Sequence, residues 1–104
     1  MSKYSTKELW EERYGKQEAV YDYAGRIMLK SACGNPNSAY HPTLDHIRPI
    51  ACGGHDTKEN IVICHSATNE EKADRFPHWK TNDRRFHAKK QPGTNKGYHI
   101  VADQ

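Results

Sequence analysis

The sequence lacks long hydrophobic segments and any pattern of paired cysteines. None of its apolar runs approaches the roughly 18 residues of a membrane-spanning helix, and no charged n-region followed by an apolar h-region opens it. Cys33, Cys52 and Cys64 are an odd number without a CxxC pair, which argues against a disulfide framework. Internal repeats and low-complexity segments are also missing. We therefore expect a soluble cytoplasmic protein with reduced thiols and no membrane partner.

Apolar residues are scarce as well. Only 35% of the 104 residues are hydrophobic, and the mean hydropathy is -1.06. A chain of this length forms one domain that buries roughly 60–70% of its unfolded surface, so its core is small. Two Trp, six Tyr and two Phe still argue against a disordered chain, because disordered sequences are poor in aromatics. We expect a single domain over residues 1–104, with a metal ion or a bound partner adding stability.

Positive charge is concentrated at the C-terminal end. Residues 1–75 contain ten Lys and Arg against eleven Asp and Glu, a net charge of -1. Residues 76–104 contain six against two, a net charge of +4. A basic end beside a near-neutral body suits a polyanion partner. A solvated basic tail explains the same distribution equally well.

Capping and turn residues divide the first part of the chain into short elements. Ser5 followed by Glu8 has the capping-box spacing, which predicts a helix over residues 7–17. Residues 19–29 are rich in β-branched and aromatic side chains around a glycine, which predicts a bent strand or two short elements. Residues 31–42 are dense in Gly, Pro, Asn and Ser and are expected to form a loop.

The second part of the chain has the pattern of a hairpin, a helix and further strands. Two short extended segments, TLDHIRPI and IVIC, flank a loop that contains Gly-Gly, which predicts a β-hairpin. Ser66 or Thr68 can cap a following helix, which Pro77 should end. Turn pairs at 82–83 and 92–93 then predict two or three short strands. The predicted fold is α+β, with an N-terminal helix and short C-terminal strands.

The stretch from Thr43 to Ala73 contains the groups that phosphodiester hydrolysis requires. The imidazole of His46 can accept a proton from water, because the ordinary pKa of a histidine lies near neutrality. Oxygens of Asp45 and Asn69 suit a hard divalent cation such as Mg²⁺. Asp45 and His46 are adjacent in a predicted strand, so their side chains point to opposite faces unless the backbone bends. A shared site therefore requires an irregular strand end.

Three further polar residues have both a functional and a structural interpretation. Asn60 closes the Gly-Gly loop and can bind backbone groups that fix the loop near His46, or it is only a turn residue. Lys72 lies three residues after Asn69 on the same helical face, where it contacts a phosphate or remains a solvated charge. Arg48 contacts a phosphate or lies on an exposed face.

The order and spacing of these residues resemble the HNH endonuclease family, whose core is a ββα-metal motif around one divalent ion. The residues that carry the resemblance are Asp45, His46, Ile47, Pro49, Gly53, Gly54, Asn60, Asn69 and Lys72. Asn69 stands where many relatives carry His, which makes this an HNN variant, as in the HNH domains of RNA-guided nucleases. The flanks, AGRIMLKSACGNPNSAY and EEKADRFPHW, are similar to those of small bacterial or phage HNH proteins.

The resemblance implies a metal-dependent endonuclease that hydrolyses DNA phosphodiester bonds. Its ββα-metal core would span residues 43–75, and residues 76–104 would form a basic extension. His46 would be the general base, Asp45 and Asn69 would hold one divalent cation, and Asn60 would support the histidine loop. The expected ion is Mg²⁺, with Mn²⁺ or another divalent ion as alternatives. The expected partner is DNA, bound by a monomer or homodimer, with phage or mobile-element proteins as further candidates.

The expected contacts with DNA phosphates come from basic side chains, since such contacts are independent of base sequence. These residues are Arg48, Lys72, Lys80, Arg84, Arg85, Lys89 and Lys90. The remaining histidines lack a matching spacing and are expected at surface or packing positions: His55, His78, His87 and His99.

Two other classes of function remain open from the sequence. Many relatives have a structural zinc bound by two CxxC pairs, which this chain lacks. Cys33, His41, Cys64 and His65 include four zinc ligands by type, but free cysteines are more often small buried residues, so we expect no structural zinc. If these four did bind zinc, the chain could be a small interaction domain. A non-catalytic nucleic-acid-binding module on the same scaffold is the other alternative.

Overall fold

The computed structural model describes residues 2–104 and confirms an α+β fold, which contains two helices and three small antiparallel sheets. The helices and strands are α1 (Thr6–Tyr14), β1 (Ala19–Tyr21), β2 (Ile27–Leu29), β3 (Pro42–His46), β4 (Ile61–His65), α2 (Ser66–Lys72), β5 (His78–Thr81), β6 (Arg84–Lys90) and β7 (Tyr98–Ala102). Three short 3₁₀ turns connect them: η1 (Lys30–Ala32), η2 (Ile50–Cys52) and η3 (Lys58–Asn60). Strand order is β1-β2, β3-β4 and β5-β6-β7.

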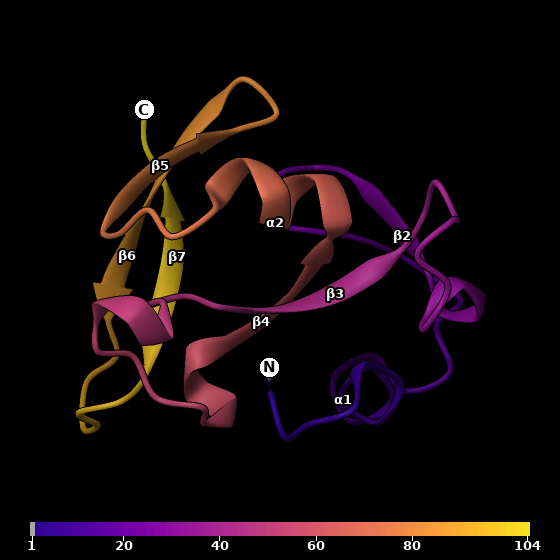
Figure 1. Cartoon of the computed structure of the whole chain (residues 1–104), viewed down its shortest axis with the longest axis horizontal. Coiled ribbons are helices and arrows are strands. Elements are labelled where there is room, and N and C mark those ends of the chain that lie inside the picture. Colours follow the sequence, from indigo (N-terminus) through magenta and orange to yellow (C-terminus); the bar gives the residue numbers. More distant parts are fainter. Residues whose placement is uncertain (1) are drawn as a thin grey trace.

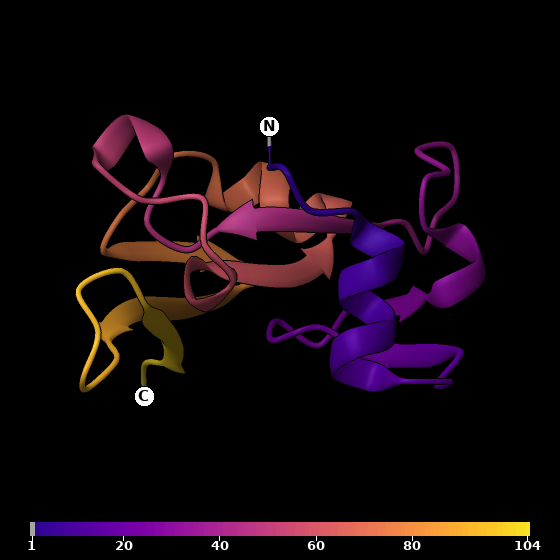
Figure 2. The ribbon, with the colours of Figure 1, turned by 90° about the horizontal axis from the view of Figure 1, so that it is seen from below.

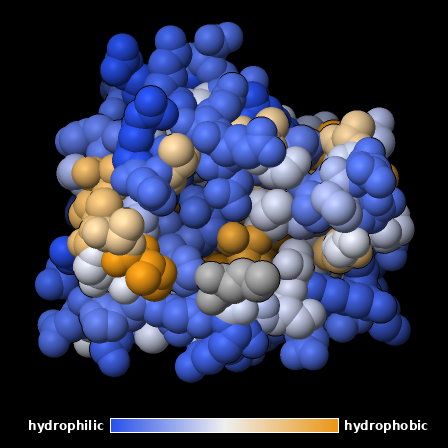
Figure 3. All heavy atoms as spheres, viewed as in Figure 1, coloured by the Kyte–Doolittle hydropathy of each residue, from blue (hydrophilic) through white to orange (hydrophobic). Residues whose placement is uncertain are grey.

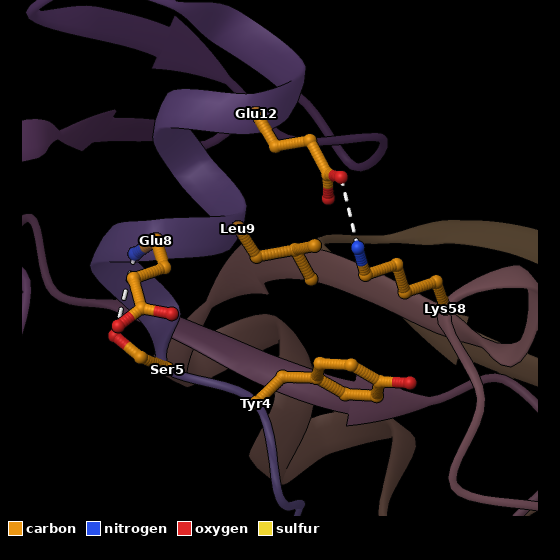
Figure 4. A pocket seen from close by; sticks show the side chains of 6 residues that line it. All are labelled: Tyr4, Ser5, Glu8, Leu9, Glu12 and Lys58. Atoms are coloured by element: carbon orange, nitrogen blue, oxygen red, sulfur yellow. Dashed lines mark hydrogen bonds and ion pairs between the residues drawn. The ribbon is translucent and has the colours of Figure 1, made fainter.

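Helix α1 begins where its capping residue predicts. The hydroxyl of Ser5 accepts a hydrogen bond from the backbone N–H of Glu8, as Figure 4 shows. Gly15 ends the helix with a φ of +61°, a backbone conformation that side chains with a Cβ disfavour. Leu9 and Trp10 are buried, so this helix contributes mainly to the core.

Strands β1 and β2 form a small hairpin, which settles the two alternatives for residues 19–29 in favour of two short elements. Asp22 closes the turn between them, because its Oδ1 accepts hydrogen bonds from the N–H groups of Ala24 and Arg26. Asp22 is only 6% exposed, and a buried carboxylate requires such donors.

The β3–β4 hairpin lies between the two helices, with α1 on one side and α2 on the other (Figures 1 and 2). Its register pairs Asp45 with Val62 and His46 with Ile61. Ile61 and Ile63 pack against Leu9 and Trp10 of α1. Val62 points the other way, into a second cluster with the C-terminal sheet. The hairpin therefore separates two small cores.

Helix α2 differs from its prediction at both ends. Its N-terminal cap is His65, whose ring Nδ1 accepts a hydrogen bond from the N–H of Ala67, so the prediction of Ser66 or Thr68 as cap was wrong. The helix ends at Lys72, before Pro77, because Ala73 adopts a φ of +51°. Histidine is an uncommon N-terminal cap. The statistical preference for Ser and Thr at this position therefore favoured the hydroxyls of Ser66 and Thr68.

Strands β5, β6 and β7 form a sheet that packs one face against α2 and the β3–β4 hairpin (Figure 1). Trp79, Phe86 and Tyr98 are buried on this inner face. The predicted turn at 82–83 is confirmed, and both of its residues have positive φ. The outer face of the sheet points away from the hairpin. By strand alternation it bears charged and imidazole side chains, among them Lys80, Arg85 and His87.

Neither helix in the described part of the chain has the length and apolar character that crossing a bilayer demands. The face shown in Figure 3 is mostly hydrophilic, and its apolar side chains lie in small separate patches. Ile50 is among the exposed large hydrophobic residues, at 52%.

Candidate active site

The free edge of β3 is the place where α2 meets the predicted site residues. Ile47 N–H donates to Asn60 O at 2.8 Å, so residues 47 and 60 form a hydrogen-bonded pair of the antiparallel ladder. Because such pairs alternate, the carbonyls of Leu44 and His46 point away from β4. Side chains of α2 reach both of them: Asn69 Nδ2 lies 3.5 Å from Leu44 O, and Lys72 Nζ lies 3.1 Å from His46 O.

Asp45 lies beside this edge in a strongly desolvated position. Its Oδ2 lies 3.3 Å from Lys72 Nζ as an ion pair, and the side chain is 13% exposed. Oδ2 itself is buried and accepts no well-formed hydrogen bond among the described residues. Burial raises the pKa of the Asp45 carboxyl, and the neighbouring charges of Lys72 and His46 oppose that rise. Asp45 is therefore a buried carboxylate whose charge is balanced by Lys72.

Asn69 presents a carboxamide on the same side of the hairpin. Its Nδ2 donates to Thr43 Oγ1 at 3.0 Å, which fixes the amide at the edge of β3. Thr43 and Asp45 are two residues apart on one face of the strand, and Asn69 and Lys72 are three apart on one face of the helix. The structure thus brings Asp45, Asn69 and Lys72 to one interface between β3 and α2.

His46 leaves the strand on the opposite face from Asp45. Its Nε2 lies 2.8 Å from Oδ1 of Asp56, a residue of the Gly-Gly loop. The other oxygen of Asp56 accepts a hydrogen bond from the N–H of Lys3 at 2.8 Å. The hydrogen bond from Lys3 lowers the pKa of Asp56 most, and the bond with His46 lowers it further. The pKa therefore lies well below its usual range, and the carboxylate stays ionised beside the imidazole. Sequence reasoning did not identify Asp56.

The strand remains regular up to its last residue. Register pairs continue without a bulge through Asp45 and His46, so the two side chains have separate partners on α2 and on the loop. The irregular strand end that a shared site was expected to need is not present before His46. Since β3 ends at His46 and its outer edge pairs with no strand in the described chain, these two side chains lie on either side of one open edge.

Asn60 holds the loop that follows β3. Its Oδ1 accepts from the N–H of Arg48, and its Nδ2 donates to the carbonyls of Arg48 and His55. The side chain is completely buried, at 0% exposure. The amide therefore crosslinks both ends of the loop, in line with the structural role expected for it.

The Gly-Gly turn of this loop has a steric reason. Gly53 has a φ of +90°, in the left-handed region. A Cβ on Gly54 would lie 1.8 Å from the carbonyl oxygen of Arg48, far inside contact distance. The loop can fold back on the segment after His46 only with glycine at this second position.

A buried polar network fixes the position of α2. Oδ2 of Asp22 accepts from Thr68 Oγ1 at 2.6 Å and from the N–H of His65 at 3.0 Å. Arg26 donates to Thr68 and also to Glu71 at 2.8 Å. The turn of the β1–β2 hairpin is thereby tied to the first turn of the helix that carries Asn69. These contacts join residues more than 40 positions apart, which the sequence alone does not indicate.

Two basic residues assigned to phosphate contacts have internal partners. Lys72 is 0% exposed and lies 5.1 Å from the Trp79 ring centroid, so it is not a solvated helix charge. In this arrangement its ammonium contacts Asp45 and is not accessible to solvent. Arg48 donates to Cys52 O at 2.8 Å and to the hydroxyl of Tyr98 at 3.1 Å, so it braces the loop against β7.

The C-terminal basic residues are all exposed but do not share one surface. By strand alternation, Lys80, Arg85 and Lys89 lie on the outer face of the sheet. Arg84 and Lys90 have the parity of the buried Phe86 and lie at the ends of β6. The outer-face residues therefore point away from α2 and the β3 edge.

The four residues considered for structural zinc do not assemble into a ligand cluster within residues 2–104. Burial raises the pKa of the Cys64 thiol, with the nearby Asp45 carboxylate adding to the rise, so this thiol remains protonated. Both ring nitrogens of His65 are engaged, Nδ1 as the cap of α2 and Nε2 with Ala39 O at 2.7 Å. Cys33 is half-buried beside the α1 core.

In comparison with protein families, residues 38–78 match the model of the HNH endonuclease family. This range contains the β3–β4 hairpin, the Gly-Gly loop and α2, so the similarity covers the segment that carries Asp45, His46 and Asn69. No curated protein and no solved structure matches the chain.

Proposed function

We propose that the protein is a metal-dependent endonuclease that hydrolyses DNA phosphodiester bonds at the free edge of β3. The observation that carries the proposal is the position of Asp45, Asn69 and His46 around this edge, within the segment that matches the HNH endonucleases. The match to the HNH endonuclease family supports a nucleic-acid substrate. The choice of DNA and the assignment of individual residues are our inference.

The donor set at the interface of β3 and α2 suits a hard divalent cation. Asp45 has a buried carboxylate oxygen without a well-formed hydrogen bond, and Asn69 has its amide nitrogen bound to Thr43, which leaves its oxygen for a ligand. Carboxylate and carboxamide oxygens are the ligands that Mg²⁺ prefers, and Mn²⁺ accepts them too. Bound there, such an ion would neutralise phosphoryl charge and stabilise the departing oxygen.

His46 is the group proposed to accept the proton of the attacking water. Asp56 is hydrogen-bonded to its Nε2, which leaves Nδ1 as the nitrogen that faces the substrate. An ionised carboxylate orients the imidazole and stabilises its protonated form once it has taken the proton. Asp56 is therefore a positioning residue, and Asn60 supports the same loop from inside.

Exposed basic side chains are proposed to bind the phosphate backbone away from the reacting group. Arg84 and Lys90 lie at the ends of β6 on the side of the sheet that faces α2. Lys80, Arg85 and Lys89 lie on the outer face, so a duplex bound at β3 would reach them only by passing the sheet edge. Such contacts weaken as salt rises. One domain holds one site, so cutting both DNA strands requires two protein molecules or two successive binding events.

Supercoiled plasmid cleavage tests the proposal directly. The wild-type protein should nick plasmid DNA in Mg²⁺, and this cleavage should stop when the metal is chelated. Asp45→Asn and Asn69→Ala should each lose this activity, whereas Glu70→Ala, a change at the neighbouring exposed position of α2, should retain it. Binding of DNA in a gel shift without cleavage in any divalent metal would overturn the nuclease proposal and favour a non-catalytic binding module.

A further inference from the structure

The outer face of the C-terminal sheet brings together two histidines and an aspartate that the proposed nuclease site does not use. His78 on β5, His87 on β6 and Asp103 after β7 each offer one ligand atom, and these atoms lie within 4.8 Å of one another. The three residues are separated by up to 25 positions in the sequence, so only the folded sheet assembles them. They lie on the opposite side of this sheet from α2, away from Asp45 and Asn69.

Sheet register explains why the two imidazoles lie close together. His78 and His87 are direct cross-strand partners. Ala88 N–H donates to Pro77 O at 2.8 Å, so residues 77 and 88 occupy a hydrogen-bonded position and the next pair, 78 and 87, does not. Side chains of a non-hydrogen-bonded pair approach each other more closely, and the two ring centroids are 5.7 Å apart.

Asp103 is held on the same face by its own backbone. Its N–H donates to Arg85 O at 2.8 Å, which continues the ladder one residue beyond β7. Its Oδ1 lies 2.5 Å from His87 Nδ1. The carboxylate thus already stands beside one imidazole, and the side chains of His87 and Asp103 are each only about one-third exposed, at 32% and 33%.

We propose that His78, His87 and Asp103 bind a zinc-class divalent ion at a second metal site. Two imidazole nitrogens and one carboxylate oxygen are the ligands of zinc sites that keep an open position for water or another group. Imidazole favours Zn²⁺ and related transition metals over Mg²⁺, so the ion differs in class from that of the β3 site. Ligands of one tetrahedral zinc lie about 3.3 Å apart, so the present spacing must close by roughly 1.5 Å at most. Rotation of the exposed His78 side chain supplies that movement.

The surrounding charges shape what this site does. Arg75, Lys80 and Arg85 line the same hollow as His78 and Asp103. They oppose a cation electrostatically, but they favour an anionic group, such as a phosphate, at the open coordination position. A bound ion would also link Asp103 to β5 and β6, and so fix the C-terminal end of the sheet.

Metal titration in excess Mg²⁺ tests the site independently of cleavage. Excess Mg²⁺ competes for the oxygen ligands of the site proposed at β3, and Co²⁺ then reports imidazole binding through its visible absorption. Wild type should bind one more equivalent of Co²⁺ or Zn²⁺ than the double variant His78→Asn, His87→Asn. His99→Asn is the matched control, because His99 is exposed on the same face opposite Lys89 and outside the cluster. Equal binding by wild type and the double variant would overturn the proposal.

A second measurement uses the unaltered protein. In the NMR spectrum, sub-stoichiometric Zn²⁺ should shift the imidazole signals of His78 and His87 before those of His55 and His99. Shifts confined to other histidines would contradict the assignment, whatever the folding state of the variants. Zinc should also raise the thermal unfolding midpoint of wild type and leave that of the double variant unchanged.

Discussion

The ammonium of Lys72 lies 3.3 Å from Oδ2 of Asp45, and no part of the Lys72 side chain reaches solvent. The same ammonium donates to the carbonyl oxygen of His46 at 3.1 Å. One buried cation is therefore bound to both residues of the Asp-His pair. Its position, three residues after Asn69, makes it the anchor of α2 on the free edge of β3.

Replacing this cation should strongly destabilise the fold. Lys72→Met leaves the Asp45 carboxylate desolvated without its counter-charge, and we expect a loss of about 2–4 kcal/mol in the free energy of unfolding, measured by urea denaturation. Adding Asp45→Asn to this variant should recover part of the loss. Lys58→Met is the matched control, because Lys58 pairs with Glu12 at the surface (Figure 4) and should change little. Equal effects of the two Lys→Met changes would contradict the anchor role.

Asn60 should be equally sensitive. Asn60→Ala removes three hydrogen bonds to Arg48 and His55 and leaves buried backbone groups without partners. We expect a loss of about 2–4 kcal/mol of stability, measured by urea denaturation. Asn37→Ala, in an exposed loop, is the control and should leave the stability unchanged. A wild-type denaturation midpoint for Asn60→Ala would show that the loop does not depend on this amide.

Glu71 makes part of the stability depend on pH. Hydrogen bonds from Thr81, the Asn82 N–H and Arg26 lower the pKa of Glu71 from 4.5 to about 2. Because the folded-state pKa is depressed, these bonds stabilise the fold above pH 4.5 and are lost as the pH falls from 4.5 toward 2. The difference in thermal midpoint between wild type and Glu71→Gln should therefore shrink across this interval.

The neighbouring helix residue supplies the control for that measurement. Glu70→Gln alters an exposed carboxylate of the same helix. Its thermal midpoint should follow that of wild type across the same acid range. A pH-independent effect of Glu71→Gln would mean that the hydrogen bonds do not depend on the charge of Glu71.

Local signals in the sequence predicted a large part of the fold. Ser5 marks the start of α1, and the two apolar runs around the Gly-Gly loop form the predicted hairpin, because capping and turn preferences act over a few residues. The end of α1 was predicted less well, because the helix stops at Tyr14 and not at residue 17. The cap of α2 was mispredicted, because His65 performs a task that hydroxyl residues usually perform. Local preference could not reveal this contact.

Partners distant in the sequence account for what could not be predicted at the candidate site. Asp56 contacts His46 and Lys3, and Asp22 contacts Thr68, through packing that joins separate elements. Nothing in the residue types around Lys72 distinguishes a buried ammonium from a solvated one. Spacing did indicate which residues approach the β3 edge, and strand alternation predicted that Asp45 and His46 point to opposite faces. It did not reveal that each side chain has its own partner, Lys72 for Asp45 and Asp56 for His46.

Asp56 should matter for cleavage more than for stability. Asp56→Asn keeps the shape of the side chain but removes the charge that faces His46 Nε2. We expect the rate of plasmid nicking in Mg²⁺ to fall by about ten- to a hundredfold, less than a loss of the base itself would cause. Asp74→Asn, an exposed change just after α2, should retain the wild-type rate. An unchanged rate for Asp56→Asn would remove Asp56 from its positioning role.

The central claim is that His46 is the general base of a metal-dependent nuclease, and its most direct measurement is the nicking rate of His46→Ala in Mg²⁺. The variant should lose cleavage while its circular dichroism spectrum and its binding to DNA remain those of wild type. His55→Ala, an exposed histidine of the same loop, should cut as wild type does. Cleavage by His46→Ala at the wild-type rate would contradict the account.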